Sequence, residues 1–141
     1  MAQRIVPFIA YEDAAGAIEW LERAFGFVEN ESERHTEEDG RVTHAELSLD
    51  GATIYVANPT PEYVSPRRHR ETCEAMRRAY DNPYVVDGQF VEVDDVEGHC
   101  ERARAAGATI LREPEEPGHG FRIYAAEDLE GHRWMFGQRG G

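Results

Sequence analysis

The sequence feature that most constrains the fold is a pattern of two adjacent strands that occurs twice. Residues 120–138 predict two strands joined by an acidic turn that ends in glycine, and residues 42–57 show the same pattern around an Asp-Gly turn. Successive side chains on a strand point to opposite faces, so Trp134 and Phe136 share one face and Met135 lies on the other. A hairpin that recurs in this way predicts an internal repeat.

The residues before the first hairpin predict a strand, a helix and a second strand. An apolar strand covers residues 4–11 and is followed by a helix over Ala14–Phe25, with Asp13 as its N-cap and Gly26 at its end. A charged strand over residues 27–36 then reaches an Asp-Gly turn that leads into the hairpin. The first half therefore has the order βαβββ.

The second half of the chain shows the same order. A strand over residues 90–93 leads to Asp94, which together with Glu97 resembles a capping box and predicts a helix to about Ala106. A strand over residues 108–112 and a loop rich in proline, glutamate and glycine precede the second hairpin. We expect an α+β fold in which the paired βαβββ modules form a curved mixed sheet with helices on its outer face. The other face would be a trough suited to a small ligand.

Residues 59–87 differ from both modules. They hold four of the seven prolines, and Ser65 before a proline predicts a helix start, with a narrow apolar stripe as far as Tyr80. We interpret this stretch as a linker with one helix. The predicted organisation is a single domain over residues 1–141, with a first module over 1–58, the linker over 59–87 and a second module over 88–138.

The composition excludes several kinds of partner and chemistry. The formal net charge of −13 argues against binding to nucleic acid or to a membrane surface, since both are polyanions. All 15 basic residues are arginine, so Schiff-base chemistry on a lysine is excluded. Cys73 and Cys100 lack a CxxC partner, and the sequence shows neither a signal peptide nor a run of about 18 apolar residues. We therefore expect a cytoplasmic protein with reduced thiols.

His44 and Glu46 are candidates for chemistry, because alternation places them on one face of a strand. That face is either solvated, as in many antiparallel sheets, or turned towards the trough. A metal site needs three or four converging ligands, so Asp87 or Glu92 would have to complete it. The sequence contains no nucleophile motif and no glycine-rich phosphate loop.

Two arginines of the second hairpin, Arg122 and Arg133, are placed to hold an anion if they face the trough. Phe8, Phe90 and Met135 would then form an apolar wall, although each also fits an ordinary core position. The arginines of the linker helix have glutamates nearby, which favours a solvated face over a contact with a second subunit or a carboxylate ligand.

Together these motifs resemble the vicinal oxygen chelate superfamily, which includes glyoxalase I, extradiol dioxygenases, fosfomycin resistance proteins and bleomycin-binding resistance proteins. The resemblance covers nearly all of the chain. It is carried by residues 90–96, by the helix end at 105–109, by Arg112-Glu-Pro and by residues 128–136. At residues 128–129 this chain has Asp-Leu where the family usually has Asp-Pro.

Metal-dependent members of that superfamily take four ligands, two from each module. The resemblance places these positions at Val6, Glu46, Gly88 and Met135. Of these, Glu46 alone is a residue type that binds such metals. The resemblance therefore implies the metal-free branch, whose dimers bind a drug or metabolite by shape and stacking.

We accordingly expect a homodimer that binds a small molecule, a drug or a metabolite, with no metal and no cofactor, and we favour a binding protein over an enzyme. The expected ligand-binding residues are Phe8, His44, Glu46, Phe90, Glu92, Arg122 and Met135. The two glutamates would be counter-charges for a cationic ligand. One alternative is a metal-dependent lyase, isomerase or dioxygenase of the same superfamily with a displaced site around His44 and Glu46. A fused interaction module is another, and no catalytic residue is assigned.

Overall fold

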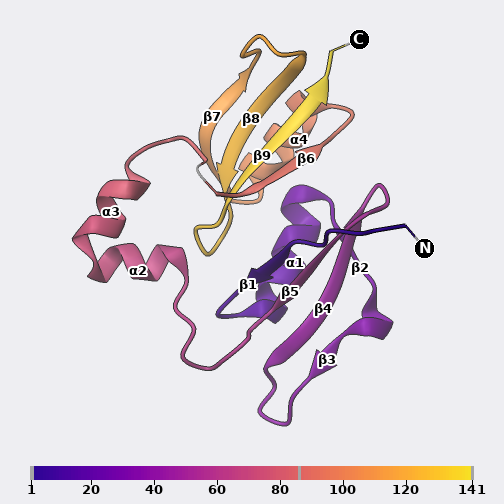
Figure 1. Cartoon of the computed structure of the whole chain (residues 1–141), viewed down its shortest axis with the longest axis vertical. Coiled ribbons are helices and arrows are strands. Elements are labelled where there is room, and N and C mark those ends of the chain that lie inside the picture. The colour runs from indigo at the N-terminus through magenta and orange to yellow at the C-terminus, as the bar shows by residue number, and fades with distance from the viewer. Residues whose placement is uncertain (1, 86, 141) are drawn as a thin grey trace. The chain divides into compact units, whose positions relative to one another are not determined.

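The computed structural model describes residues 2–85 and 87–140 (Figure 1). The chain divides into two compact units, residues 1–64 and residues 65–141. The first unit contains a five-stranded mixed sheet and the second a four-stranded mixed sheet. The predicted α+β class is therefore confirmed.

The first unit has the predicted order βαβββ, with one strand interrupted. Its elements are β1 (Phe8–Ala10), α1 (Ala14–Phe25), β2 (Val28–Glu29), the 3₁₀ turn η1 (Glu31–Glu33), β3 (His35–Thr36), β4 (Val42–Leu49) and β5 (Ala52–Ala57). Strand β1 pairs in parallel with β5, which is antiparallel to β4. Both β2 and β3 pair with β4, so the charged edge strand is present in two pieces.

Local side-chain contacts explain where this unit departs from the prediction. The guanidinium of Arg34 donates two hydrogen bonds of 2.8 Å to Glu29, and Ser32 donates to Asn30 at 2.9 Å. Such contacts compete with strand pairing and favour the turn between β2 and β3. The first strand begins at Phe8 rather than at residue 4, and Pro7 in front of it has no N–H for the ladder.

The second unit begins with two short helices and continues with the second βαβββ repeat. Its elements are α2 (Pro66–Thr72), α3 (Glu74–Tyr80), β6 (Gln89–Glu92), α4 (Val96–Ala105), β7 (Thr109–Glu115), β8 (Phe121–Glu127) and β9 (Arg133–Arg139). One helix was predicted where α2 and α3 lie. The break falls at Cys73, whose backbone is extended, and the Thr72 hydroxyl donates to the carbonyl of His69 at 3.2 Å. That bond competes with helix continuation.

Two further boundaries differ from the prediction. The N-cap of α4 is Asp95 and not Asp94, because Asp95 Oδ1 accepts the N–H of Gly98 at 3.1 Å. Strand β7 continues to Glu115, through residues predicted as a loop, with irregular register on both sides of Arg112. Bulges of this kind let a strand accommodate Pro114, which has no N–H.

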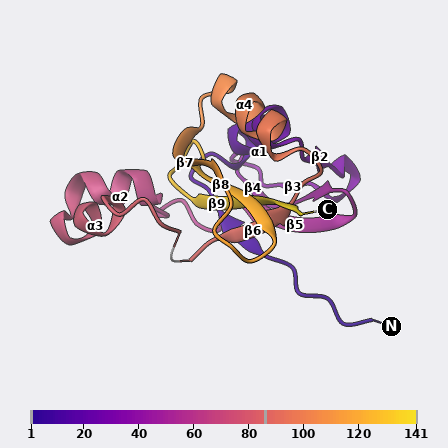
Figure 2. The ribbon, with the colours of Figure 1, turned by 90° about the horizontal axis from the view of Figure 1, so that it is seen from above.

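The two units share one topology. The strand orders are β1-β5-β4-β2 and β6-β9-β8-β7, with a parallel pair at the start of each. The registers also correspond, because Phe8 pairs with Tyr55 as Phe90 pairs with Met135. Figure 2 shows α1 and α4, each against one face of its own unit's sheet. We call the opposite face of each sheet its open face.

Candidate functional site

The open face of the second sheet is identified by what its other face buries. Tyr124, Trp134 and Phe136 are fully buried, and the ring centroid of Phe136 lies 4.3 Å from that of His99 on α4. Because side chains alternate along a strand, the neighbours Ala125 and Met135 lie on the open face, where they form a cross-strand pair.

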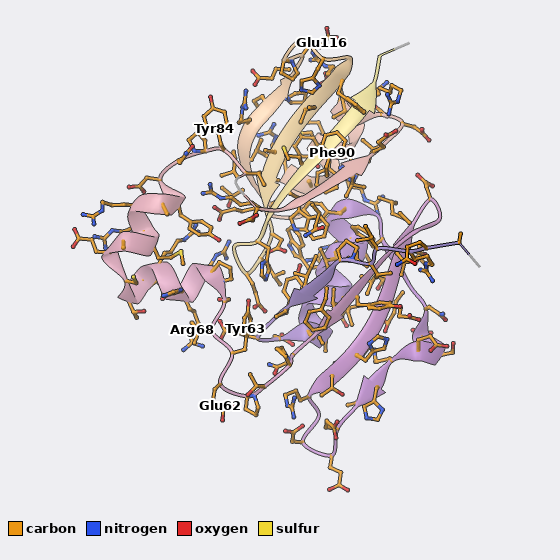
Figure 3. All side chains as sticks on the ribbon, in the orientation of Figure 1. Glu62, Tyr63, Arg68, Tyr84, Phe90 and Glu116 are labelled. Atoms are coloured by element: carbon orange, nitrogen blue, oxygen red, sulfur yellow. The ribbon has the colours of Figure 1, made fainter. Side chains whose placement is uncertain are left out.

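A cavity of about 160 Å³ lies on this open face. Its apolar lining comes from Val85, Ile123, Ala125 and Met135, and its polar lining from Tyr84, Arg112, Glu115 and His119. The Arg112 guanidinium lies 4.7 Å from the ring centroid of Tyr84 and forms an ion pair with Glu115. Figure 3 shows Tyr84 on the segment between α3 and β6. We call Tyr84 and Val85 the outer wall of the cavity.

An aromatic cluster continues the open face on the side of β6. Phe90, labelled in Figure 3, is 42% exposed. It meets Phe121 edge-on, with ring centroids 5.1 Å apart. The Phe90 ring lies over the backbone of Gly137, because a Cβ added at Gly137 would be 2.6 Å from that ring. Arg139 lies 4.5 Å from the Phe121 ring centroid and donates to Glu92 at 2.9 Å. Glu92 is therefore paired with a cation of its own sheet.

A buried ion network lies beside the outer wall. The side chains of Arg133 and Glu127 are 7% and 3% exposed, and Arg133 donates to Glu127 through Nε and Nη2. Arg70 of α2 donates to both oxygens of the same carboxylate at 2.9 and 3.0 Å. Burial raises the pKa of Glu127, but the hydrogen bonds from Arg70 and Arg133 outweigh it and leave the pKa below the ordinary 4.5.

The guanidinium of Arg133 is thus occupied by the Glu127 carboxylate inside the unit rather than available to an anionic ligand. Arg122, expected among the ligand-binding residues, lies on the helix side of the sheet, where its Nε donates to Glu97 of α4. Its cross-strand partner is Gln138, and it does not share a face with Met135. These positions follow from strand alternation once α4 is placed.

In the first unit, Phe8, Tyr55 and Glu46 form a row across three strands on the open face. His44 Nε2 lies 3.9 Å from Glu46 Oε1, and the His44 ring meets the Tyr55 ring at 4.9 Å. A polar pocket of about 290 Å³ lies next to Glu46 and includes Ser48 and Thr53. The pocket in this unit is therefore mainly polar, whereas the cavity of the second unit has a partly apolar lining.

The register changes one assignment that followed from the resemblance. Met135 lies on β9, whose counterpart in the first unit is β5, and the residue at the matching register is Tyr55. Glu46 lies on β4 instead. The four positions are then Val6, Tyr55, Gly88 and Met135, none of which is a histidine, carboxylate or cysteine. Within residues 2–85 and 87–140, no group of three or more His, Cys, Asp or Glu side chains is arranged to hold a metal ion.

Of the seven residues expected to bind a ligand, Met135 lines the apolar cavity. Phe90 and Glu92 lie on the same open face, and Phe8, His44 and Glu46 belong to the first unit. Tyr84 and Arg112 line the cavity but were not predicted from the sequence as binding residues. Tyr84 lies in a segment without periodicity, which carries no pattern to identify it.

None of the described helices is long and apolar enough to cross a membrane.

Comparisons with known proteins show which family model and which relatives match this chain. The family model described as Glyoxalase/Bleomycin resistance protein/Dioxygenase superfamily matches residues 4–136. The uncharacterized protein Mb0911c of Mycobacterium bovis is 30% identical over 132 residues, which is 94% of this chain and 80% of that protein.

Two solved structures have the same fold. TioX from Micromonospora sp. ML1 is 31% identical with a TM-score of 0.68, and the alignment covers 98% of this chain and 99% of that chain. TnmS3, an antibiotic binding protein from Streptomyces sp. CB03234, is 19% identical with a TM-score of 0.64, and covers 99% and 98%.

Proposed function

The chain belongs to the Glyoxalase/Bleomycin resistance protein/Dioxygenase superfamily, and from this premise we propose that it binds a small, largely apolar molecule, a drug or a metabolite, without using a metal ion. The cavity on the open face of the second sheet carries the proposal. Its volume of about 160 Å³ is close to that of an apolar protein cavity that holds one benzene molecule, about 150 Å³. It therefore suits one ring, or one ring of a larger molecule.

The lining supports an uncharged or mixed-charge ligand rather than a cation. Ile123, Ala125 and Met135 offer apolar surface, and the Met135 thioether suits contact with an aromatic ring. Arg112 and Glu115 carry opposite charges that pair with each other. Glu92, earlier expected as a counter-charge, is occupied by Arg139. The net charge of the whole chain is thus a poor guide to this cavity.

The comparisons give independent support for binding. TnmS3 is described as an antibiotic binding protein, so the fold serves small-molecule binding in that protein. The positions that the resemblance, adjusted by the strand register, assigns to metal ligands are occupied by Val6, Tyr55, Gly88 and Met135. Those side chains lack the imidazole, carboxylate and thiolate groups that hold catalytic metals, which favours binding without a metal.

The methionines provide a direct test. The chain has three methionines, of which Met135 lines the cavity and Met76 lies on α3 outside its lining. We would label the methionine ε-methyl groups with ¹³C and titrate the protein with 5-fluoroindole as probe. The Met135 signal, assigned with Met135→Leu, should shift saturably while the Met76 signal stays in place. An unmoved Met135 signal up to the solubility limit of the probe would refute the proposal.

A pair of matched variants strengthens the test. Ala125→Leu fills the cavity, because Ala125 lines it, and should abolish binding of 5-fluoroindole. Thr53→Leu also enlarges a side chain on an open face, but that of the first sheet, and should leave the affinity unchanged. Equal affinities in the two variants would contradict the assignment of the cavity.

The homodimer, which the resemblance implies, and the cytoplasmic location, which was expected from the sequence pattern, belong to this proposal as expectations. Native mass spectrometry of the purified protein reports the subunit count, a bound metal ion and any ligand carried from the cell. A dimer with a small organic ligand is the expected result. A protein that retains a stoichiometric divalent metal would instead favour the alternative of a metal-dependent enzyme.

A further inference from the structure

We infer that Arg133 is the positioning residue of the cavity, although it is not part of the lining. It holds the outer wall, Tyr84 and Val85, against β9. The use of this cavity for a ligand rests on the proposed function, whereas the role of Arg133 in fixing the wall does not. The inference follows from where the guanidinium places its five N–H donors.

The outer wall has no secondary structure of its own. Tyr84 and Val85 lie after α3 and before β6, outside helices and strands. A segment of this kind keeps one conformation only when its backbone groups find partners elsewhere. Here one side chain supplies the partner of the Tyr84 carbonyl, and also the partners of the Tyr80 and Asn82 carbonyls just before the outer wall.

Arg133 uses all five of its N–H donors. Nη1 donates to the carbonyls of Asn82 and Tyr84, the latter at 3.0 Å, and Nη2 donates to the carbonyl of Tyr80 at 2.6 Å. Nε and Nη2 donate to Glu127 at 3.0 and 2.9 Å. A guanidinium has five donors in a rigid fork, so these bonds fix the direction of the carbonyls as well as their distance.

The fork is itself held in place. Its carbon lies 4.5 Å from the ring centroid of Tyr80, and its cross-strand partner is Glu127. Arg133 also lies two residues from Met135 on the same strand, so β9 supplies both a lining side chain and the anchor of the outer wall. A displacement of this anchor changes the shape of the cavity without removing any lining side chain.

A purely stabilising role makes a different prediction, and Arg70 separates the two. Arg70 also donates two hydrogen bonds to Glu127 and lies 5.1 Å from the Tyr80 ring centroid. These two bonds end on the Glu127 carboxylate and reach no carbonyl of the outer wall. Arg70→Lys and Arg133→Lys therefore both weaken the ion pairing of Glu127. Arg133→Lys alone removes donors from the Tyr84 carbonyl and the segment before it, since lysine has three donors instead of five.

Hydrogen exchange measured by mass spectrometry on the protein without ligand is the decisive experiment. In the wild-type protein, a peptide covering residues 80–85 should exchange more slowly than an unstructured peptide of the same sequence. Arg133→Lys should speed exchange there by about tenfold or more, because at least two charge-assisted hydrogen bonds are lost. Arg70→Lys should change it by about twofold at most, even where both variants lower Tm by similar amounts.

The readout on binding follows with the 5-fluoroindole titration. Arg133→Lys should weaken the affinity for 5-fluoroindole by about tenfold, while the Met135 signal still shows a folded protein. Arg70→Lys should leave the affinity near that of wild type. Equal acceleration of exchange by the two variants, or a wild-type segment 80–85 that exchanges like the free peptide, would overturn the inference. If the wild-type protein does not bind 5-fluoroindole, the proposed function fails and the exchange data still decide the role of Arg133.

Discussion

Substitution of Asp128 by asparagine gives a stability prediction that can be worked out from individual bonds. Asp128 lies in the turn between β8 and β9 and is 1% exposed. Its Oδ1 accepts the N–H groups of Glu130 and His132, each at 3.0 Å. Its Oδ2 accepts the indole N–H of Trp134 at 3.0 Å. One buried carboxylate thus orders the turn and orients the largest core side chain.

Asparagine retains one carbonyl oxygen and replaces the other oxygen by an NH₂ group. With the carbonyl kept on the two backbone N–H groups, the NH₂ faces the indole N–H, and the two donors oppose each other. A buried donor left without an acceptor costs about 1–3 kcal/mol, so Asp128→Asn should lower the free energy of unfolding by about that amount. Asp128→Ala leaves all three donors without this acceptor and should cost about 3–5 kcal/mol.

Urea denaturation followed by circular dichroism at neutral pH measures these differences. In a Trp134→Phe background the indole donor is absent, so Asp128→Asn should cost clearly less there than in the wild-type background. Asp39→Asn is the control, because Asp39 also accepts a backbone N–H in a turn, but in an exposed position, and its change should be within about 0.5 kcal/mol. An equal cost of Asp128→Asn in both backgrounds would refute the assigned role of the indole bond.

Three further predictions concern protonation, thiol reactivity and strand pairing. The pKa of Glu127 is lowered below 4.5 in the folded protein. Its contribution to stability is therefore complete above pH 4.5 and is lost as the pH falls through the pKa of the folded protein. Glu127→Gln should make the acid side of a stability-against-pH curve shallower. Burial raises the pKa of Cys100 to about 11, so in a titration with a thiol reagent at pH 8 the half-buried Cys73 should react first and Cys100 only after unfolding. A Cβ on Gly88 would lie 2.4 Å from the backbone carbonyl oxygen of Arg133, so Gly88→Ala should lower Tm by several degrees in a thermal melt, whereas unchanged Tm would show that β6 pairs differently.

Several elements could be predicted from the sequence because their ends are set by residues a few positions away. Helix α1 has the predicted bounds, since Asp13 accepts the N–H of Gly16 at 3.0 Å and Gly26 adopts a left-handed φ of 85°. The β4–β5 hairpin follows from Asp50 and Gly51, whose φ values of 48° and 87° are those that an Asp-Gly turn accommodates.

The misplaced elements depend on competition between local signals or on distant partners. Asp94 and Asp95 are both acceptable caps, and the helix begins after the one whose carboxylate reaches Gly98. The same spacing joins Asp13 to Gly16, so an aspartate three residues before a glycine was the signal available in both repeats. The extension of β7 to Glu115 depends on pairing with Ile123 of β8, which local pattern does not reveal.

The repeated order of elements and the residues that share a strand face could be predicted from the amino-acid pattern, because caps, turns and alternation act over a few positions. The packing of the folded chain set which face each helix covers, and with it the opposite placements of Arg122 and Met135. It also placed the outer wall, where Arg133 donates to the carbonyl of Tyr84 from 49 positions away. The physical reason is that a buried guanidinium must satisfy its donors with whatever acceptors the folded chain brings near, and periodicity carries no information about such distant partners.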